Sequence, residues 1–159
     1  MAGRSDDWRD LYRREEPDSD IGYLSYNETV LEHFMNPHNV GLIEDPDGQA
    51  VVGDPTCGDY IEVYIKFKGE RIVDFKFLIS GCPAAIATSS IATELAIGKT
   101  IEEAMALTDN DVIVTAGGIP ARKAHCSLLA IRGLQQAIQD YLKKNSRTAR
   151  KAYEAIDRH

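Results

Sequence analysis

Apolar and polar residues alternate along two neighbouring stretches of the chain, and this period of two predicts a β-hairpin. The apolar positions are Ile61, Val63, Ile65 and Phe67 in the first stretch and Val73, Phe75, Phe77 and Ile79 in the second. The turn between them contains Gly69. Because each strand has one strongly apolar face, we expect a small antiparallel sheet covered on one face by helices, an α+β arrangement.

Two capping boxes predict where helices begin on either side of this hairpin. Ser25 with Glu28 forms the first box, and Asn36-Pro37 ends the helix that follows it. Thr100 with Glu103 forms the second box, ahead of a short helix.

Two longer helices follow from apolar residues at helical spacing. The first is expected over about 84–97, after Pro83 in the first turn and before a closing Gly98. The last long helix is expected to begin near 125–127. Between them, residues 109–121 carry both strand and loop signals, so we expect this stretch to be mostly irregular.

The distribution of charge divides the chain into three parts. Residues 1–20 read as a charged N-terminal extension with seven acidic residues against four arginines, and apolar residues around Trp8 and Leu11 predict a short helix there. Residues 21–145 form the main domain, and 146–159 a basic C-terminal tail or helix extension. The basic end is either an ordinary solvated surface or a docking surface for a protein partner.

Composition narrows the class of protein. A chain of 159 residues with 43% hydrophobic residues can bury one core without disulfides. The three cysteines are odd in number and far apart, and the N-terminus lacks an apolar stretch typical of a signal peptide, so a reducing, cytoplasmic location is expected. The net charge of −7 argues against nucleic-acid binding, and the absence of a long apolar run argues against a membrane span.

The candidate chemistry lies at the turns: Cys57 with Asp59, then Cys82, then the adjacent pair His125-Cys126. Thiolate, imidazole and carboxylate together bind zinc, copper or iron-sulfur clusters. Cys82 precedes a predicted helix, whose positive end lowers a thiol pKa and favours the thiolate. Each cysteine could instead fill a loop or a core position, as free cysteines often do.

The charge of such a site bears on what it could hold. Three thiolates and a neutral imidazole carry three negative charges, which an oxidised [2Fe-2S] core would reduce to one. A zinc ion would use three or four of the same donors. A site that includes the Asp59 carboxylate should hold its cargo less firmly than four cysteines would. Lys123 either stabilises a thiolate or persulfide at Cys126 or is an ordinary solvated lysine, and His33, His38 and His159 read as ordinary surface or core residues.

Four ordered motifs resemble the iron-sulfur cluster assembly scaffolds of the IscU type and the N-terminal domain of NifU, over about 26–143. These motifs are Asn36-Pro37-His38-Asn39-Val40-Gly41, residues 53–59, residues 80–90, and residues 117–127. The resemblance implies an α+β fold with an antiparallel sheet of about three strands and helices packed on one face. It also implies a scaffold for assembly of a [2Fe-2S] cluster and its transfer to apo-proteins, rather than a turnover enzyme.

The resemblance also implies roles for the site residues. Cys57, Cys82 and Cys126 would be the cluster or metal ligands, with Asp59 and His125 as the alternating or labile positions. Cys126 would accept persulfide sulfur, and Asp59 would make the cluster labile. Iron is the metal of the transient [2Fe-2S] cluster, and zinc would take the same donors in the isolated protein.

The implied partners are a cysteine desulfurase of the IscS/NifS kind, an electron donor such as ferredoxin, and apo iron-sulfur acceptor proteins. Residues 119–123 only partly match the Leu-Pro-Pro-Val-Lys sequence by which IscU-type scaffolds engage an Hsp70-type chaperone, which puts that partner in doubt. SufU-like scaffolds are the near alternative. They lack a histidine beside the last cysteine, so His125 favours the IscU/NifU side.

Two other classes of function remain open on the residues alone. One is a zinc-activated sulfurtransferase or hydrolase, with Cys57, Cys82 and either His125 or Cys126 as ligands and Asp59 as base. The other is a protein whose zinc is purely structural, which would close a four-ligand site and lose its fold on chelation.

Overall fold

The computed structural model describes residues 26–54 and 59–157, with the backbone alone at 54, 122 and 147–157. The predicted N-terminal helix, Ser25 and Cys57 therefore lie outside the described residues. In chain order the elements are α1 (Glu28–Met35), β1 (Gly48–Asp54), β2 (Asp59–Lys68), β3 (Arg71–Ser80), α2 (Pro83–Ala96), α3 (Ile101–Met105), α4 (Asp109–Thr115), the 3-10 helix η3 (Ala121–Cys126) and α5 (Ser127–Asp157).

The sheet has three antiparallel strands in the order β1-β2-β3, which confirms the predicted α+β fold and hairpin. In the hairpin, Ile61 pairs with Ile79 and Val63 with Phe77, while Gly69 turns the chain with a φ of 64°.

The buried residues Ile61, Val63 and Ile65 of β2 face the same side as Phe75 and Phe77 of β3. The prediction for Val73 is wrong: it is 46% exposed, and Ile72 is buried in its place because the register shifts between Lys66 and Phe67.

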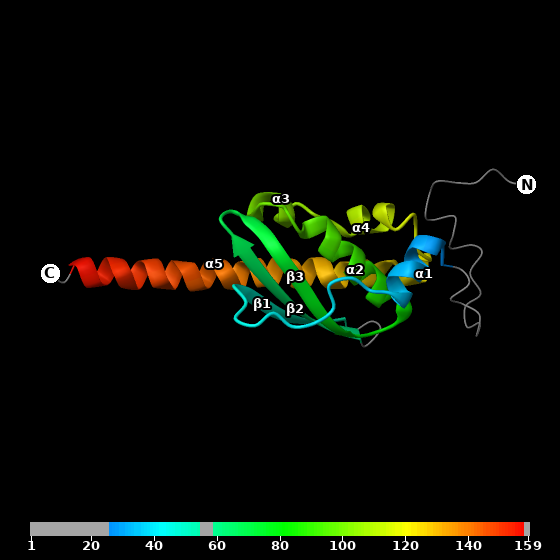
Figure 1. Ribbon diagram of the computed structural model, residues 1–159, viewed down its shortest axis with the longest axis horizontal. Coiled ribbons are helices and arrows are strands. Elements are labelled where there is room, and N and C mark those ends of the chain that lie inside the picture. The colour runs from blue at the N-terminus through cyan, green and yellow to red at the C-terminus, as the bar shows by residue number, and fades with distance from the viewer. Residues whose placement is uncertain (1–25, 55–58, 158–159) are drawn as a thin grey trace, which may run out of the picture.

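The helices cover that apolar face, as predicted (Figure 1). α5 packs on β1 and β2, α2 packs on β3 and α5, and α4 contacts both α2 and α5. Together they close one core, whose largest fully buried side chains include Phe75, Phe77, Ile61, Ile91, Leu134 and Ile138. Because this core is continuous from strands to helices, its stability comes mainly from apolar burial.

Two expectations about the helices need correction, and a third is confirmed. α1 begins with Asn27 as its N-cap, whose side chain accepts from the Val30 backbone N–H, and not with the predicted Ser25 capping box. The stretch expected to be irregular contains α4, opened by a capping box of Thr108 with Asp111. The other predicted box, Thr100 with Glu103, is confirmed at α3.

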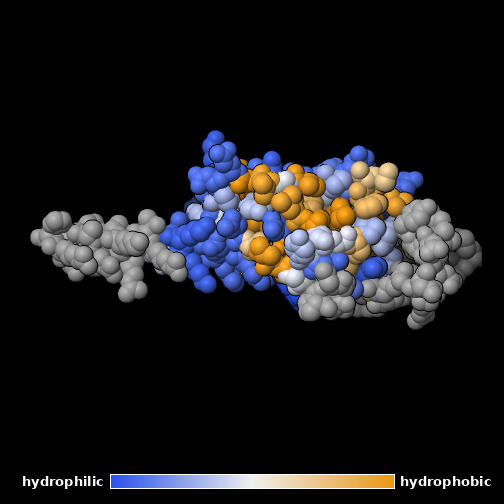
Figure 2. Space-filling model, turned by 90° about the horizontal axis from the view of Figure 1, so that it is seen from below, coloured by the Kyte–Doolittle hydropathy of each residue, from blue (hydrophilic) through white to orange (hydrophobic). Residues whose placement is uncertain are grey.

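α5 is 31 residues long, so it runs past the sheet and projects from the body toward the C-terminus (Figure 1). Residues 146–157 continue this helix. Seen from below, the surface is hydrophilic near the point where α5 leaves the body and has hydrophobic patches over the middle (Figure 2). None of the helices in the described part of the chain combines the length and apolar character needed to cross a membrane.

Candidate metal and cluster centre

The hairpin brings Asp59 next to the segment that carries Cys82. Asp59 is the first residue of β2, and its neighbour Tyr60 pairs with Ser80 at the end of β3. Antiparallel pairing therefore puts Asp59 beside the two residues that follow β3, Gly81 and Cys82. The Asp59 carboxylate accepts a hydrogen bond from the Cys82 backbone N–H, with 3.4 Å between Oδ2 and N.

Gly81 is required by this close approach. A Cβ atom at Gly81 would lie 2.9 Å from Cγ of Asp59 and 3.1 Å from Cβ of Ala85. Real Cβ contacts are longer, so any other residue would push the carboxylate away from Cys82. The sequence analysis did not single out this glycine, although it stands immediately before the cysteine.

The third residue lies at the junction of η3 and α5. Cys126 is the last residue of η3, and its Sγ atom lies 3.6 Å from Sγ of Cys82. The Thr88 hydroxyl of α2 lies 3.5 Å from the Cys126 carbonyl oxygen, which fixes this junction against α2. Asp59, Cys82 and Cys126 each offer a ligand atom, and these atoms all lie within 4.8 Å of one another.

His125 lies at the edge of this group. Its Nε2 atom is 3.7 Å from Sγ of Cys126, but it is not one of the three residues whose ligand atoms meet. The structure thus brings together Asp59, Cys82 and Cys126, with His125 beside the last of them. Their proposed roles as ligands remain predictions.

The three residues differ in how far they are buried. Cys126 is 1% exposed and Asp59 is 8% exposed, whereas Cys82 is half-buried. Cys126 is buried because it joins the apolar core at the start of α5. Among the two described cysteines, Cys82 is thus the one that solvent reaches.

Cys82 is also poised to be a thiolate. Its pKa is lowered from 9.0 to about 6, first because Cys126 donates a hydrogen bond to its sulfur. Burial opposes this shift, while the Ala85 backbone N–H and the charge of Lys123 add to it, and Asp59 acts against it. The Ala85 N–H belongs to the first turn of α2, in keeping with the predicted effect of a helix N-terminus. The predicted charge effect of Lys123 falls on Cys82.

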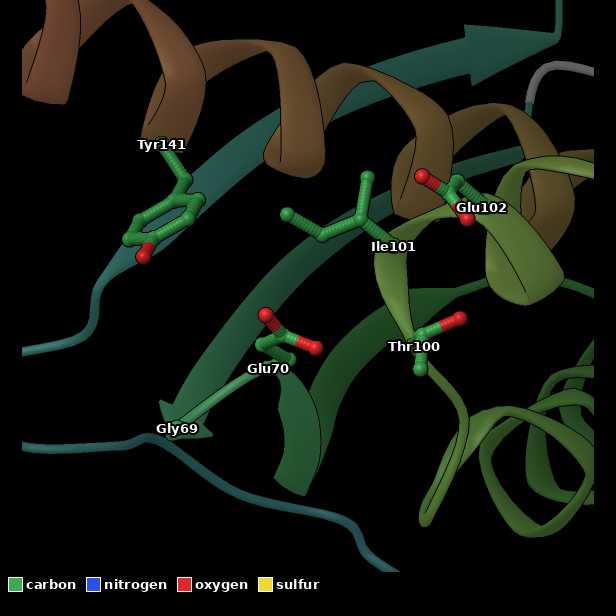
Figure 3. Close-up of a pocket in the computed structure, with 6 residues that line it drawn as sticks. All are labelled: Gly69, Glu70, Thr100, Ile101, Glu102 and Tyr141. Carbon is green, nitrogen blue, oxygen red and sulfur yellow. The ribbon is translucent and has the colours of Figure 1, made fainter.

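A pocket at the end of the sheet away from the cysteines is lined by a different set of side chains from the cysteine site (Figure 3). Its lining residues are Gly69, Glu70, Thr100, Ile101, Glu102 and Tyr141. The hairpin turn at Gly69 stands at the opposite end of β2 from Asp59, about 30 Å away at the usual strand rise. Because this lining offers no thiol or imidazole, the pocket is separate from the cysteine site.

Comparison with known proteins agrees with the motifs. Residues 25–148 match the family model described as the NifU-like N terminal domain. The iron-sulfur cluster assembly scaffold protein IscU 1 of Archaeoglobus fulgidus is 55% identical over 122 residues, covering 77% of this chain and 80% of the relative. The corresponding protein IscU of Aquifex aeolicus is 46% identical over 126 residues, covering 78% of this chain and 80% of the relative.

A solved structure supports the fold. The N-terminal NifU-like protein from Brucella abortus superposes with a TM-score of 0.61 at 20% identity, covering 74% of this chain and 94% of that one. At this identity the likeness concerns the architecture of the sheet and its helices.

Proposed function

Because the chain belongs to the family of NifU-like N-terminal domains, we propose that it is a scaffold on which iron-sulfur clusters are assembled and from which they pass to other proteins. One observation supports this most directly. A carboxylate and two sulfur atoms from three separate connections meet within 4.8 Å of one another. This donor set has the softness that iron-sulfur chemistry needs, together with one harder, weaker ligand.

The cargo we propose is a transient [2Fe-2S] cluster held by Cys57, Cys82 and Cys126, with Asp59 and His125 completing the site. The thiolate state of Cys82 suits this purpose, because thiolates and not thiols bind iron. Zinc would be bound by the same donors in the isolated protein. In this role the protein provides the ligands on which the cluster is built and does not convert a small molecule into a product.

We propose that Asp59 makes the cluster labile. Its carboxylate is held beside Cys82 by the Cys82 N–H and by the absence of a side chain at Gly81. An oxygen ligand competes poorly with sulfur for a cluster iron, so this position is the one that an incoming acceptor protein can displace. His125, next to Cys126, would be the other exchangeable position.

Sulfur would come from a cysteine desulfurase of the IscS/NifS kind. A scaffold thiolate attacks the outer sulfur of the desulfurase persulfide, so that one S–S bond forms as another breaks and the desulfurase thiolate leaves. We assign this acceptor role to Cys126, which would first pass its proton to the Cys82 thiolate, 3.6 Å away, and so become the attacking thiolate. The transferred sulfur must then be reduced to sulfide, which calls for an electron donor such as ferredoxin. Because Cys126 is 1% exposed, η3 has to open before sulfur can reach it.

The site calls for a reducing compartment such as the cytoplasm. Two sulfur atoms at 3.6 Å, one of them a thiolate, are open to oxidation to a disulfide, which would remove both as ligands. The finished cluster would then pass to apo iron-sulfur acceptor proteins.

The test is anaerobic reconstitution with ferrous iron, cysteine and a desulfurase, read by the visible spectrum and by iron, sulfide and zinc content. The expected result is a [2Fe-2S] spectrum on the wild-type protein, with no cluster formed in its absence. Failure of the wild type to form a cluster with all components active would overturn the scaffold function.

Two variants separate the proposed roles. Cys126→Ser is expected to abolish persulfide at the scaffold, measured by mass spectrometry. If Cys82→Ser abolishes it instead, sulfur arrives at the more exposed cysteine and the assignment of Cys126 is wrong.

Asp59→Ala is expected to slow cluster transfer to an apo-acceptor, whereas Asp74→Ala, the same change outside the site, should leave the transfer rate unchanged. Equal rates in all three proteins would show that Asp59 does not set lability.

Chelation distinguishes the scaffold from a structural zinc protein. The core joins three strands to α2 and α5 through apolar side chains. We therefore expect far-UV circular dichroism to survive removal of bound zinc. Loss of the helical spectrum on chelation would favour the structural reading.

A further inference from the structure

Two histidines and a glutamate meet at the end of α2 that lies away from the cysteines. His33 belongs to the last turn of α1, His38 follows that helix, and Glu94 stands in the last turn of α2. Each residue offers one ligand atom, and these atoms all lie within 4.8 Å of one another. Three separate backbone segments therefore aim imidazole and carboxylate groups at one point.

The distances are close to those of a metal site. The Nε2 atom of His33 lies 3.6 Å from Oε1 of Glu94, and the imidazole rings of His33 and His38 are 4.8 Å apart between centroids. Ligand atoms at about 2.0–2.1 Å from a tetrahedral ion stand roughly 3.3 Å from each other. The remaining pair, Nδ1 of His38 and Oε1 of Glu94, is hydrogen-bonded at 2.5 Å. A metal that replaces the shared proton needs this pair to open by about 0.8 Å.

A supporting shell already orients the two imidazoles. The Ser90 hydroxyl of α2 accepts a hydrogen bond from the His38 backbone N–H at 2.8 Å and lies 2.7 Å from Nδ1 of His33. When Nδ1 of His33 carries the proton and donates it to Ser90, the lone pair of Nε2 points toward Glu94. Metal-bound histidines are commonly held by a second hydrogen bond of this kind.

The segment that carries His38 is fixed on both sides. The Asn39 side chain donates to the Thr93 hydroxyl at 2.9 Å, and the Gly41 N–H donates to the Phe77 carbonyl oxygen at 2.9 Å. His38 is thus held against α2 before any ion binds. Such preorganisation lowers the entropy lost on binding.

The charge state of His33 and the exposure of His38 and Glu94 to solvent also favour binding of a metal ion. Burial lowers the pKa of His33, which keeps its imidazole neutral, the form that binds metals, although Glu94 acts in the opposite direction. The side chains of His38 and Glu94 are 46% and 48% exposed, so an ion can approach from solvent.

This group is distinct from the cysteine centre. Glu94 lies 12 residues after Cys82, which corresponds to about 18 Å along α2. Its donors are nitrogen and oxygen without sulfur, a set that suits single divalent ions and not clusters.

We propose that His33, His38 and Glu94 bind one divalent first-row transition ion such as Zn²⁺ or Fe²⁺ through two imidazole nitrogens and one carboxylate, with a coordination position left open to solvent. Sequence analysis read both histidines as ordinary residues, because neither stands beside a cysteine as His125 does, and Glu94 lies 56 residues beyond His38. The proposal goes beyond the scaffold function and does not depend on it.

Cobalt titration of the metal-free, reduced full-length protein tests the proposal, because Co²⁺ reports its own ligands. Binding at the cysteine centre gives intense sulfur-to-cobalt charge-transfer absorption in the near ultraviolet. The proposed site is expected to bind a second equivalent that adds visible ligand-field absorption without further charge transfer. Competition with Zn²⁺ and with Fe²⁺ under anaerobic conditions then shows which ion displaces this second equivalent.

His38→Ala and Glu94→Gln are the test variants, and Glu102→Gln, which removes an exposed carboxylate from α3, is the matched control. Each test variant is expected to weaken the second binding event by tenfold or more, a loss of the size seen for altered metal shells. The charge-transfer band should be unchanged, which shows that the protein is folded and the cysteine centre intact. Absence of a second equivalent in the wild type, or its retention in either test variant, would overturn the proposal.

Discussion

The low pKa of Cys82 has a specific cause that a single substitution removes. Its largest contribution is the hydrogen bond donated by Cys126, whose sulfur is 3.6 Å away. Cys126→Ala deletes this donor, while the Ala85 N–H and the Lys123 charge still favour the thiolate. Burial and Asp59 oppose these two effects, so we expect the pKa of Cys82 to rise in the variant toward its usual value of 9.0.

The two limiting pKa values of Cys82 determine how much its reaction rate can change. With a pKa of about 6, roughly 90% of Cys82 is thiolate at pH 7, whereas at 9.0 the fraction would be roughly 1%. The fraction of reactive thiolate can thus fall by up to about ninetyfold. A thiolate of higher pKa is intrinsically more nucleophilic, by roughly 16- to 32-fold over three pKa units, so at the upper limit the observed rate should fall by only about threefold to sixfold.

The assay measures the rate at which iodoacetamide alkylates the reduced, metal-free protein. The pH is varied from about 5 to about 10 in steps of about one unit, so that the range includes both limiting pKa values. Mass spectrometry of the peptide that carries Cys82 separates its modification from that of the other cysteines. The midpoint of the rate profile is expected near 6 in the wild type and well above it in Cys126→Ala.

Asp59→Asn serves as a control of opposite sign. The negative charge of Asp59 raises the pKa of Cys82, so removing this charge should lower the midpoint of the alkylation profile. A midpoint for Cys82 that stays near 6 in Cys126→Ala would refute the reasoning, because the sulfur-sulfur hydrogen bond would then not be the main cause.

Three further changes test the fold and the site. Gly133→Ala should destabilise the protein by about 1–2 kcal/mol in urea unfolding despite the higher helix propensity of alanine, because the new Cβ would lie 2.5 Å from Cγ2 of the buried Val63. Adding Val63→Ala should make the Gly133→Ala change less unfavourable, and equal costs in both backgrounds would contradict the clash. Asn27→Ala should lower the free energy of unfolding by about 2 kcal/mol, since it removes the α1 cap and the hydrogen bond to the Ala116 carbonyl oxygen. Asn27→Asp keeps the cap acceptor but loses the amide donor, so comparing the two variants separates the two contributions. Unchanged stability in both variants would show that neither the cap nor this hydrogen bond stabilises the protein. The folded-state pKa of Cys82 is depressed, so its contribution to the free energy of unfolding is complete above about pH 9 and is lost as pH falls through about 6. The stability difference between wild type and Cys82→Ser should therefore grow with pH over this window, and a difference independent of pH would show that the thiolate is not stabilised by folding.

The secondary structure could be predicted where one pattern dominated. The hairpin was predictable because apolar side chains recur every second residue along β2 and at Phe75, Phe77 and Ile79 of β3, although the shift that buries Ile72 and exposes Val73 was not. The helix α2 was predictable because Pro83 and Gly98 mark the two ends of a long apolar stretch.

α4 was missed because Val112, Ile113 and Val114 favour strands, although its capping box of Thr108 and Asp111 was visible in the sequence. Burial of Val112 and Ile113 against α2 and α5 decided in favour of the helix.

The sequence by itself determined which residues are candidates for the site, since thiols, imidazole and carboxylate stand at the turns of a predictable hairpin and helices. Only the tertiary structure decided how these groups meet. Antiparallel pairing placed Asp59 beside Cys82, and packing of η3 against α2 buried Cys126 where its sulfur shifts the pKa of its neighbour. Packing of α1 and the segment after it against α2 joined His38 to Glu94 across 56 residues of sequence. Distances, burial and pKa values depend on contacts between segments far apart in the chain, which local periodicity does not specify.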